Sequence, residues 1–318
     1  MLNDFFISLE SIAFFKTLIF GIIALCTVGV SWCLVGAIAG KVPKLGYTME
    51  SLYLTGGAVS MVFIGAVCAV TGIGECAAMP LFLTSAAFFL GGAGCFFQGV
   101  AMSRAMQSGP NGIIWAIIQS AMIFPFIFSV IFYDVKLNLL RVIGILLMLS
   151  ALMLFALAKD NSQKSGGAWK MWTFLALLVV SIEQVVTSIP FYYQQTKNIS
   201  SMYNIGCMMF GYVVSAIIMI FIKTERVAAL KKSLGEKSFW IYSIALLPLS
   251  ALIAVVLQLP GMRVMADNGL GGMSFPLLVG SCIVAFSLYS AMILKEKFKI
   301  IDIVALIFCV GGQVLLCI

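Results

Sequence analysis

Ten long apolar runs, separated by short polar segments, constrain the fold of this chain most. Each run is close to the ~20 apolar residues that a helix needs to cross a bilayer. None shows the period-two alternation of a membrane strand. The runs lie near residues 17–40, 48–70, 79–106, 111–133, 139–158, 171–194, 202–222, 238–262, 269–294 and 301–317.

Composition rules out a soluble fold. Hydrophobic residues make up 62% of the chain and charged residues only 10%, whereas about 25% of the residues in a soluble domain are charged. The sequence therefore predicts an all-α integral membrane protein with ten transmembrane helices, in contact with the lipid bilayer.

A weak internal repeat divides the chain into two halves of five runs each. Gln98, Met102, Gly109 and Gly112 recur 160 residues later as Gln258, Met262, Gly269 and Gly272. With one inserted residue, Ser129 and Lys136 recur as Ser290 and Lys297. Because five is an odd number, the halves must insert in opposite directions. We therefore predict two inverted five-helix repeats, 1–160 and 161–318, an arrangement typical of secondary transporters. The polar segments 159–167 and 223–237 are predicted linkers.

The distribution of Lys and Arg predicts the orientation, because cytoplasmic loops carry an excess of them. The N-terminal segment and the loops after even-numbered runs hold five of the 19 basic residues, and the loops after odd-numbered runs hold fourteen. We expect the second side to be cytoplasmic and both termini to be periplasmic, in the inner membrane of a bacterium. This topology accounts for the net charge of +7 without a nucleic acid partner.

The sequence has few of the residues that catalytic and cofactor-binding sites require. The chain has no His, and its nine Cys form no CxxC pair. His-dependent triads and His-ligated metals are therefore excluded, and no acidic pair lies within a run. We expect no enzyme, no cofactor and no metal site. A membrane enzyme and a structural or receptor-like protein are the alternatives outside transport.

Glu183 is the candidate functional residue that the sequence marks most clearly. It lies about halfway along the apolar run 171–194, where an ionised carboxyl costs roughly 2.5–3.5 kcal/mol. Such residues usually face a cavity and mark a solute or proton pathway. We predict that Glu183 couples transport to proton movement. The alternative is a protonated, structural carboxyl that donates a hydrogen bond to a neighbouring helix.

Other polar and aromatic residues near the middle of the runs are predicted to bind a solute. Trp115 and Gln119 share one helical face, and an interfacial anchor is the alternative for Trp115. Gln98 and Gln258 alternatively bridge helices by hydrogen bonds. The full predicted set is Glu183, Gln184, Gln119, Trp115, Gln98, Gln258, Ser31, Trp32 and Ser281.

Proline and glycine add two structural expectations. Pro125, Pro190 and Pro276 lie within runs, and each is expected to kink its helix. The patch Gly91-Gly92-Ala93-Gly94 is expected to let helices approach closely.

Two segments carry a resemblance to a known family. They are Gly99-Val-Ala-Met-Ser-Arg-Ala-Met-Gln-Ser-Gly-Pro-Asn-Gly112 and Ser290-Ala-Met-Ile-Leu-Lys-Glu-Lys297. In them the chain resembles the EamA-like, ten-helix transporters of the drug/metabolite transporter superfamily. Lys41-Val-Pro-Lys44, followed by Glu50 and Gly56-Gly57, is similar to the rhamnose–proton symporter and related sugar porters. The resemblance implies two inverted five-helix repeats and transport, and it transfers no binding residue.

A secondary transporter of a small polar metabolite is the function that these observations favour. Amides and hydroxyls suit polar solute groups, Trp faces suit stacking, and one carboxyl suits proton coupling. A sugar-like solute is favoured, and an organic cation paired with Glu183 is the alternative. The sequence does not determine the direction of transport or the oligomeric state. It is compatible with a monomer.

Overall fold

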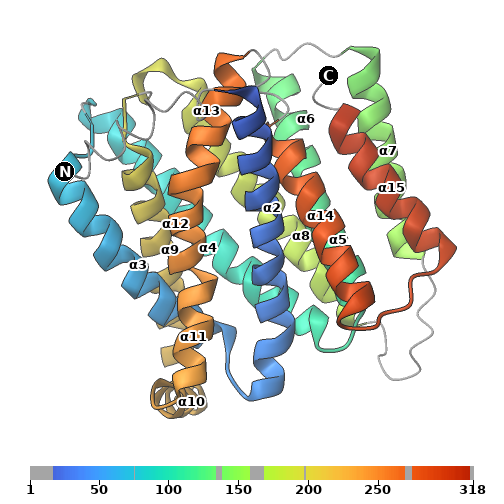
Figure 1. Cartoon of the computed structure of the whole chain (residues 1–318). Helices are drawn as coiled ribbons and strands as arrows, with labels where there is room; N and C mark the ends of the chain where they lie inside the picture. Colours follow the sequence, from blue (N-terminus) through green and yellow to red (C-terminus); the bar gives the residue numbers. More distant parts are fainter. Residues whose placement is uncertain are drawn as a thin grey trace. The chain divides into compact units, whose positions relative to one another are not determined.

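The described part of the chain is built entirely from helices (Figure 1). A computed structural model describes residues 17–74, 76–133, 138–157, 168–196, 198–268 and 274–315. Seven helices in these residues are long and apolar enough to cross a membrane, and three shorter apolar helices are Leu139–Leu154, Leu277–Met292 and Ile300–Leu315. The prediction of an all-α, membrane-like chain is confirmed, while the number ten stays a prediction.

The helices follow the predicted runs closely. In chain order they are α2 (Leu18–Lys41), η2 (Val42–Leu45), α3 (Met49–Thr71), α4 (Ala78–Met106), α5 (Asn111–Gln119), η3 (Ser120–Met122), α6 (Ile123–Phe132), α7 (Leu139–Leu157), α8 (Ala168–Ser188), η4 (Ile189–Tyr192), η5 (Gln194–Thr196), α9 (Ser201–Phe221), α10 (Thr224–Leu234), α11 (Lys237–Leu246), α12 (Pro248–Ile253), η6 (Ala254–Gln258), α13 (Leu259–Asp267), α14 (Ser274–Met292) and α15 (Ile300–Leu315).

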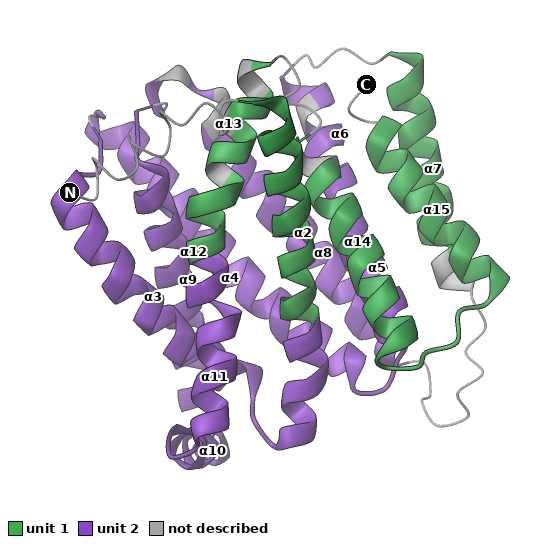
Figure 2. Cartoon of the chain, viewed as in Figure 1, with its two compact units in different colours: residues 1–36, 137–159, 252–318 green, residues 37–136, 160–251 purple. Residues whose placement is uncertain are grey.

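Contacts divide the chain into two compact units (Figure 2). Unit 1 comprises 1–36, 137–159 and 252–318, and unit 2 comprises 37–136 and 160–251. Each unit therefore draws residues from both predicted halves. The halves 1–160 and 161–318 rest on the internal repeat, which this grouping does not test, and they stay a prediction.

In unit 2, α4 packs against both α8 and α9, and α3 packs against α9 and α11. Glycines allow the close approach. A Cβ at Gly91 would lie 2.3 Å from Thr187 Cγ2, and one at Gly92 would lie 1.9 Å from the Met208 carbonyl oxygen. From the other side, a Cβ at Gly211 of α9 would lie 2.1 Å from the Phe89 carbonyl oxygen. The expected role of the glycine patch is thus confirmed.

In unit 1, α15 packs against α7 and α14. A Cβ at Gly312 of α15 would lie 2.7 Å from Met148 Cγ on α7. The unit 1 part of α2 contacts α13, because Gly21 faces Val264 and Gly261 faces Ala24. These two contacts run in opposite sequence directions, so the two helices are antiparallel.

Prolines explain several interruptions of the helices. Pro125 has no N–H to offer Ala121, and the 3₁₀ turn η3 (Ser120–Met122) separates α5 from α6 just before it. α8 ends at Ser188, and Pro190 lies in the 3₁₀ turn η4 that follows. Pro260 follows the π-helical turn η6, in which its lost partner Val256 lies. These changes of hydrogen-bond pattern compensate for the N–H groups that proline lacks.

The kink expected at Pro276 stays a prediction, because the residues just before α14 lie outside the described part. The predicted linker 223–237 joins two candidate spans, and it contains the helix α10, whose half-buried and exposed residues alternate at helical spacing. The linker 159–167 and the repeat residues Lys136, Gly269 and Gly272 lie outside the described residues.

Candidate functional site

Glu183 lies on the face of α8 that packs against α4, and its side chain is only 8% exposed. A Cβ at Gly94 would lie 2.9 Å from Glu183 Cβ, and one at Gly91 would lie 3.9 Å from Glu183 Oε1. Gly91 faces Thr187 and Gly94 faces Glu183, so α4 and α8 are antiparallel. The missing side chains of these glycines create the space that the carboxyl fills.

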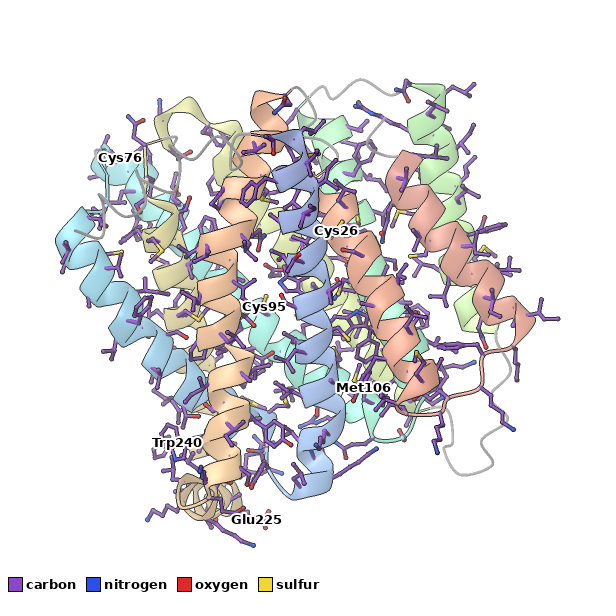
Figure 3. The ribbon with its side chains drawn as sticks, viewed as in Figure 1. Cys26, Cys76, Cys95, Met106, Glu225 and Trp240 are labelled. Atoms are coloured by element: carbon purple, nitrogen blue, oxygen red, sulfur yellow. The ribbon has the colours of Figure 1, made fainter. Side chains whose placement is uncertain are left out.

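Hydroxyl and thiol groups surround this carboxyl. The Thr187 hydroxyl lies 3.5 Å from Glu183 Oε1 and donates a stronger bond, at 2.9 Å, to the Glu183 carbonyl oxygen. The Cys95 thiol of α4 is hydrogen-bonded to the carboxyl and also to Tyr212 of α9. Figure 3 shows Cys95 near the middle of its helix, away from both ends.

Two tyrosines extend the cluster to a third and a fourth helix. The rings of Tyr53 on α3 and Tyr212 on α9 stack with centroids 5.1 Å apart and planes 16° apart. A Cβ at Gly99 of α4 would lie 2.1 Å from the Tyr53 hydroxyl oxygen. Tyr53, Tyr212, Cys95 and Glu183 therefore form one polar cluster, called the Glu183 cluster below, from α3, α9, α4 and α8; Cys95 is half-buried and the other three are buried.

The carboxyl of the Glu183 cluster has no counter-charge within the described residues, where no Lys or Arg makes an ion pair with it. An ion pair elsewhere in unit 2 joins Arg226 to Glu50 at 3.9 Å. A buried ionised carboxylate that lacks a partner is costly, and the neutral acid is much less so. The cluster can therefore hold a proton, or a cationic ligand in its place.

Trp115 and Gln119 lie on α5, which packs against α8. Trp115 is 2% exposed and Gln119 is 8% exposed. Trp115 is thus buried in the protein, and the interfacial anchor that we left open for it is wrong. Its helix packs against the helix of Glu183, as the predicted site requires.

Gln98 and Gln184, the two other predicted site residues of unit 2, are half-buried. Gln98 follows Gly91 and Cys95 at helical spacing, so it shares their face of α4. Gln184 follows Glu183 directly and points about 100° away from it around α8.

The remaining predicted residues belong to unit 1. On α14 the Ser281 hydroxyl donates to the Leu277 carbonyl oxygen at 2.6 Å, and a Cβ at Gly29 of α2 would lie 2.1 Å from Ser281 Oγ. Ser31 donates to its own helix, at Val28, and Trp32 is half-buried. Gln258 ends the π-helical turn η6 and is half-buried. Whether these residues share one pocket with Glu183 stays a prediction.

Sequence reasoning missed Cys95, Tyr53 and Tyr212. Cys95 follows the glycine patch directly, and this position beside the closest helix approach was an available signal. The tyrosines carry no such signal, because their stack depends on the pairing of α3 with α9.

A metal centre is not indicated. Among the residues that the structure describes, no group of three or more His, Cys, Asp or Glu side chains could hold a metal ion.

Comparison with known proteins supports the fold alone. A solved structure described only as the crystal structure of a protein is similar to this chain, with a TM-score of 0.55 and 16% identity. The match covers 94% of this chain and 96% of the other. No family model matches the chain, and no curated protein matches its sequence.

Proposed function

We propose that the chain is a secondary transporter that moves a small polar metabolite across the bacterial inner membrane and is coupled to protons through Glu183. The observation that carries this proposal is a buried carboxyl in an apolar helix, without an ion pair in the described residues. Residues of this kind mark ion and solute pathways in membrane proteins.

The chemistry of coupling follows from the Glu183 cluster. A neutral Glu183 fits among Thr187, Cys95 and Tyr212 at little electrostatic cost, whereas an ionised one needs water or a cation. Movement between an occluded and an open state would therefore be linked to proton binding and release. Cys95 and Thr187 would orient the carboxyl, because both contact it directly.

The helix pairings support ten spans in two inverted repeats. Numbered in chain order, α3 and α9 are the second and seventh of the ten predicted spans, and α7 and α15 are the fifth and tenth. Each pair consists of repeat-equivalent spans that pack together. The third span packs against the sixth, as α4 does against α8, and the eighth against the first, as α13 does against α2. A twofold relation between the halves would produce this pattern.

A sugar-like solute is the favoured substrate. The predicted site offers amides in Gln119, Gln98 and Gln258, and the indole of Trp115, which suit hydroxyl groups and sugar ring faces. The resemblance to the drug/metabolite transporter superfamily, and to its sugar porters, points the same way.

An organic cation is a second candidate, and the Glu183 cluster favours it specifically. The carboxyl there is without an ion pair in the described part, and the ring of Tyr53 in the same cluster contacts the rings of Tyr212 and Phe96. Carboxylates and aromatic faces both attract cations.

Thermal unfolding of the purified protein with a panel of neutral sugars and organic cations would separate these candidates. Solutes that stabilise the protein would then be tested for uptake into proteoliposomes with and without an inward proton gradient. We expect a stabilising solute to accumulate only with the gradient. If the panel includes a stabilising solute that does not cross the membrane under either condition, the transport proposal fails.

A further inference from the structure

The helix α10 lies between two candidate membrane spans and is held at both ends. α9 ends at Phe221 and α11 begins at Lys237, so both ends of α10 are tied to the same boundary of unit 2. In Figure 1, α10 is seen almost down its own axis beneath α11, which runs along the picture. It therefore lies across the spans to which it is joined, as a helix in the plane of a membrane surface would.

Specific contacts fix this position. Arg226 donates to the Met219 carbonyl oxygen at 2.6 Å and lies 3.9 Å from Glu50 at the start of α3. The Trp240 indole donates to the Leu234 carbonyl oxygen at 2.9 Å, at the last residue of α10. Figure 3 shows Glu225 and Trp240 at this end of unit 2. One face of α10 therefore packs against the rest of unit 2.

The outer side of this segment carries a surplus of positive charge. Lys223, Lys231, Lys232 and Lys237 are exposed, and within the described residues none of their side chains makes a hydrogen bond or an ion pair. Of the two acidic residues nearby, Glu236 accepts a hydrogen bond from the Tyr47 hydroxyl at 2.5 Å. This bond raises the pKa of Tyr47, which lies outside the candidate spans. Only Glu225 is left as an exposed acid between residues 223 and 237.

Exposed apolar residues flank the lysines. Phe221 is 68% exposed, Ile222 is 66% exposed and Leu234 is 40% exposed. Lysines and large apolar side chains on one short helix, with a Trp beside it, are the composition of helices that lie in the interface of an anionic bilayer. A soluble acidic protein or a nucleic acid would match the lysines but leave these apolar groups uncovered.

We propose that α10 and its flanking lysines form a binding surface for the headgroups of anionic phospholipids. The surface consists of Lys223, Lys231, Lys232 and Lys237, with Trp240 at its edge. Such binding would anchor the α9–α10–α11 segment to one leaflet. It is independent of the solute that the protein carries and of the role of Glu183.

A fluorescent reporter on α10 would test this proposal in the full-length protein. The nine native Cys are replaced by Ser, and Ala228→Cys, on the exposed face one turn before Lys231 and Lys232, carries a polarity-sensitive label. The protein is placed in phosphatidylcholine nanodiscs with rising fractions of phosphatidylglycerol. We expect a saturable signal change with phosphatidylglycerol that weakens as salt is added.

Removal of two charges should weaken this response. At about 1 kcal/mol for each Lys near an anionic surface, K231Q/K232Q should require a roughly thirtyfold higher phosphatidylglycerol activity for half-saturation. The matched control K295Q/K297Q removes two exposed lysines outside the segment and should respond as the parent does.

Three results would overturn the proposal. They are a parent signal that does not distinguish the two lipids, a K231Q/K232Q response equal to that of the control, and a response to a short RNA or an acidic peptide but not to phosphatidylglycerol. The second result would leave Lys231 and Lys232 only the role of stabilising the C-terminal end of the α10 dipole. A thermal unfolding temperature close to the parent's would show that each variant is folded.

Discussion

Individual glycines of α4 decide how closely its neighbours approach the Glu183 carboxyl. Gly91 and Gly94 face α8, whereas Gly92 faces the backbone of α9 at Met208. A side chain at Gly92 would meet a carbonyl oxygen, which cannot rotate away as a side chain can. The geometry of the site therefore depends on residues that carry no chemistry themselves.

Gly92→Ala should destabilise the protein by about 1–3 kcal/mol, the usual cost of overpacking. Gly65→Ala is the matched control, because nothing lies within 4 Å of a Cβ at this position of α3. The control should be neutral, or stabilising by up to about 1 kcal/mol, since Ala favours a helix. Denaturant unfolding in detergent measures both. Equal losses in the two variants would contradict the close contact of α4 with α9.

For single residues, the sequence predicted a candidate site wherever the position of a residue along an apolar run was enough to identify it. Glu183 could be chosen because a carboxyl in the middle of an apolar run is rare and costly. The contacts of Cys95, Tyr53 and Tyr212 could not be predicted in the same way. They depend on which helices pair and in which rotation, and helices that are apolar all round carry no stripe that would reveal it.

Among the elements, prolines predicted where the helices are interrupted, whereas the charged segment 223–237 concealed a helix. Pro125 and Pro190 coincide with changes of helix type because their missing N–H has a local effect. Lys223 to Lys237 looked like a linker because its apolar residues are few and short, yet α10 forms there and is held by Arg226 and Trp240. Tertiary contacts of this kind are invisible in a hydropathy pattern.

The pair of Arg226 and Glu50 should contribute to the docking of α10 on α3. Arg226→Gln leaves a buried carboxyl, 7% exposed, without its cation, and should cost about 1–3 kcal/mol. Glu50→Gln and the double variant complete a thermodynamic cycle measured by denaturant unfolding. We expect a favourable coupling of at least about 0.5 kcal/mol. Additive effects would show that the two side chains do not interact.

For the whole molecule, the runs predicted as spans are helical over most of their described length, but their membrane topology rests on charge alone. Labelling of single cysteines in a Cys-free protein tests it. An impermeant thiol reagent should label Asn198→Cys in intact cells and Ala228→Cys only after permeabilisation, and both positions are exposed. The opposite labelling pattern would show that the orientation is inverted. Labelling of both positions in intact cells would show that they do not lie on opposite sides of the membrane, which contradicts the predicted topology.

Helix content was predictable because each run must satisfy its backbone hydrogen bonds internally once it is in a membrane. The relation between the two halves was harder to predict from the sequence. The repeat is carried by a few residues such as Gln98 and Gln258, while the contacts group α2, α7, α14 and α15 apart from most of the other helices. Pairing between distant helices, rather than sequence order, determines those units.

The central claim is that Glu183 carries the coupling proton, and Glu183→Gln tests it most directly. Gln keeps the volume and a hydrogen-bonding side chain but cannot titrate. In proteoliposomes we predict that this variant loses solute accumulation driven by a proton gradient and retains counterflow exchange. Glu225→Gln, which removes an exposed carboxyl of α10, should keep both activities. Accumulation by Glu183→Gln in response to the gradient would contradict the account and leave Glu183 a structural carboxyl.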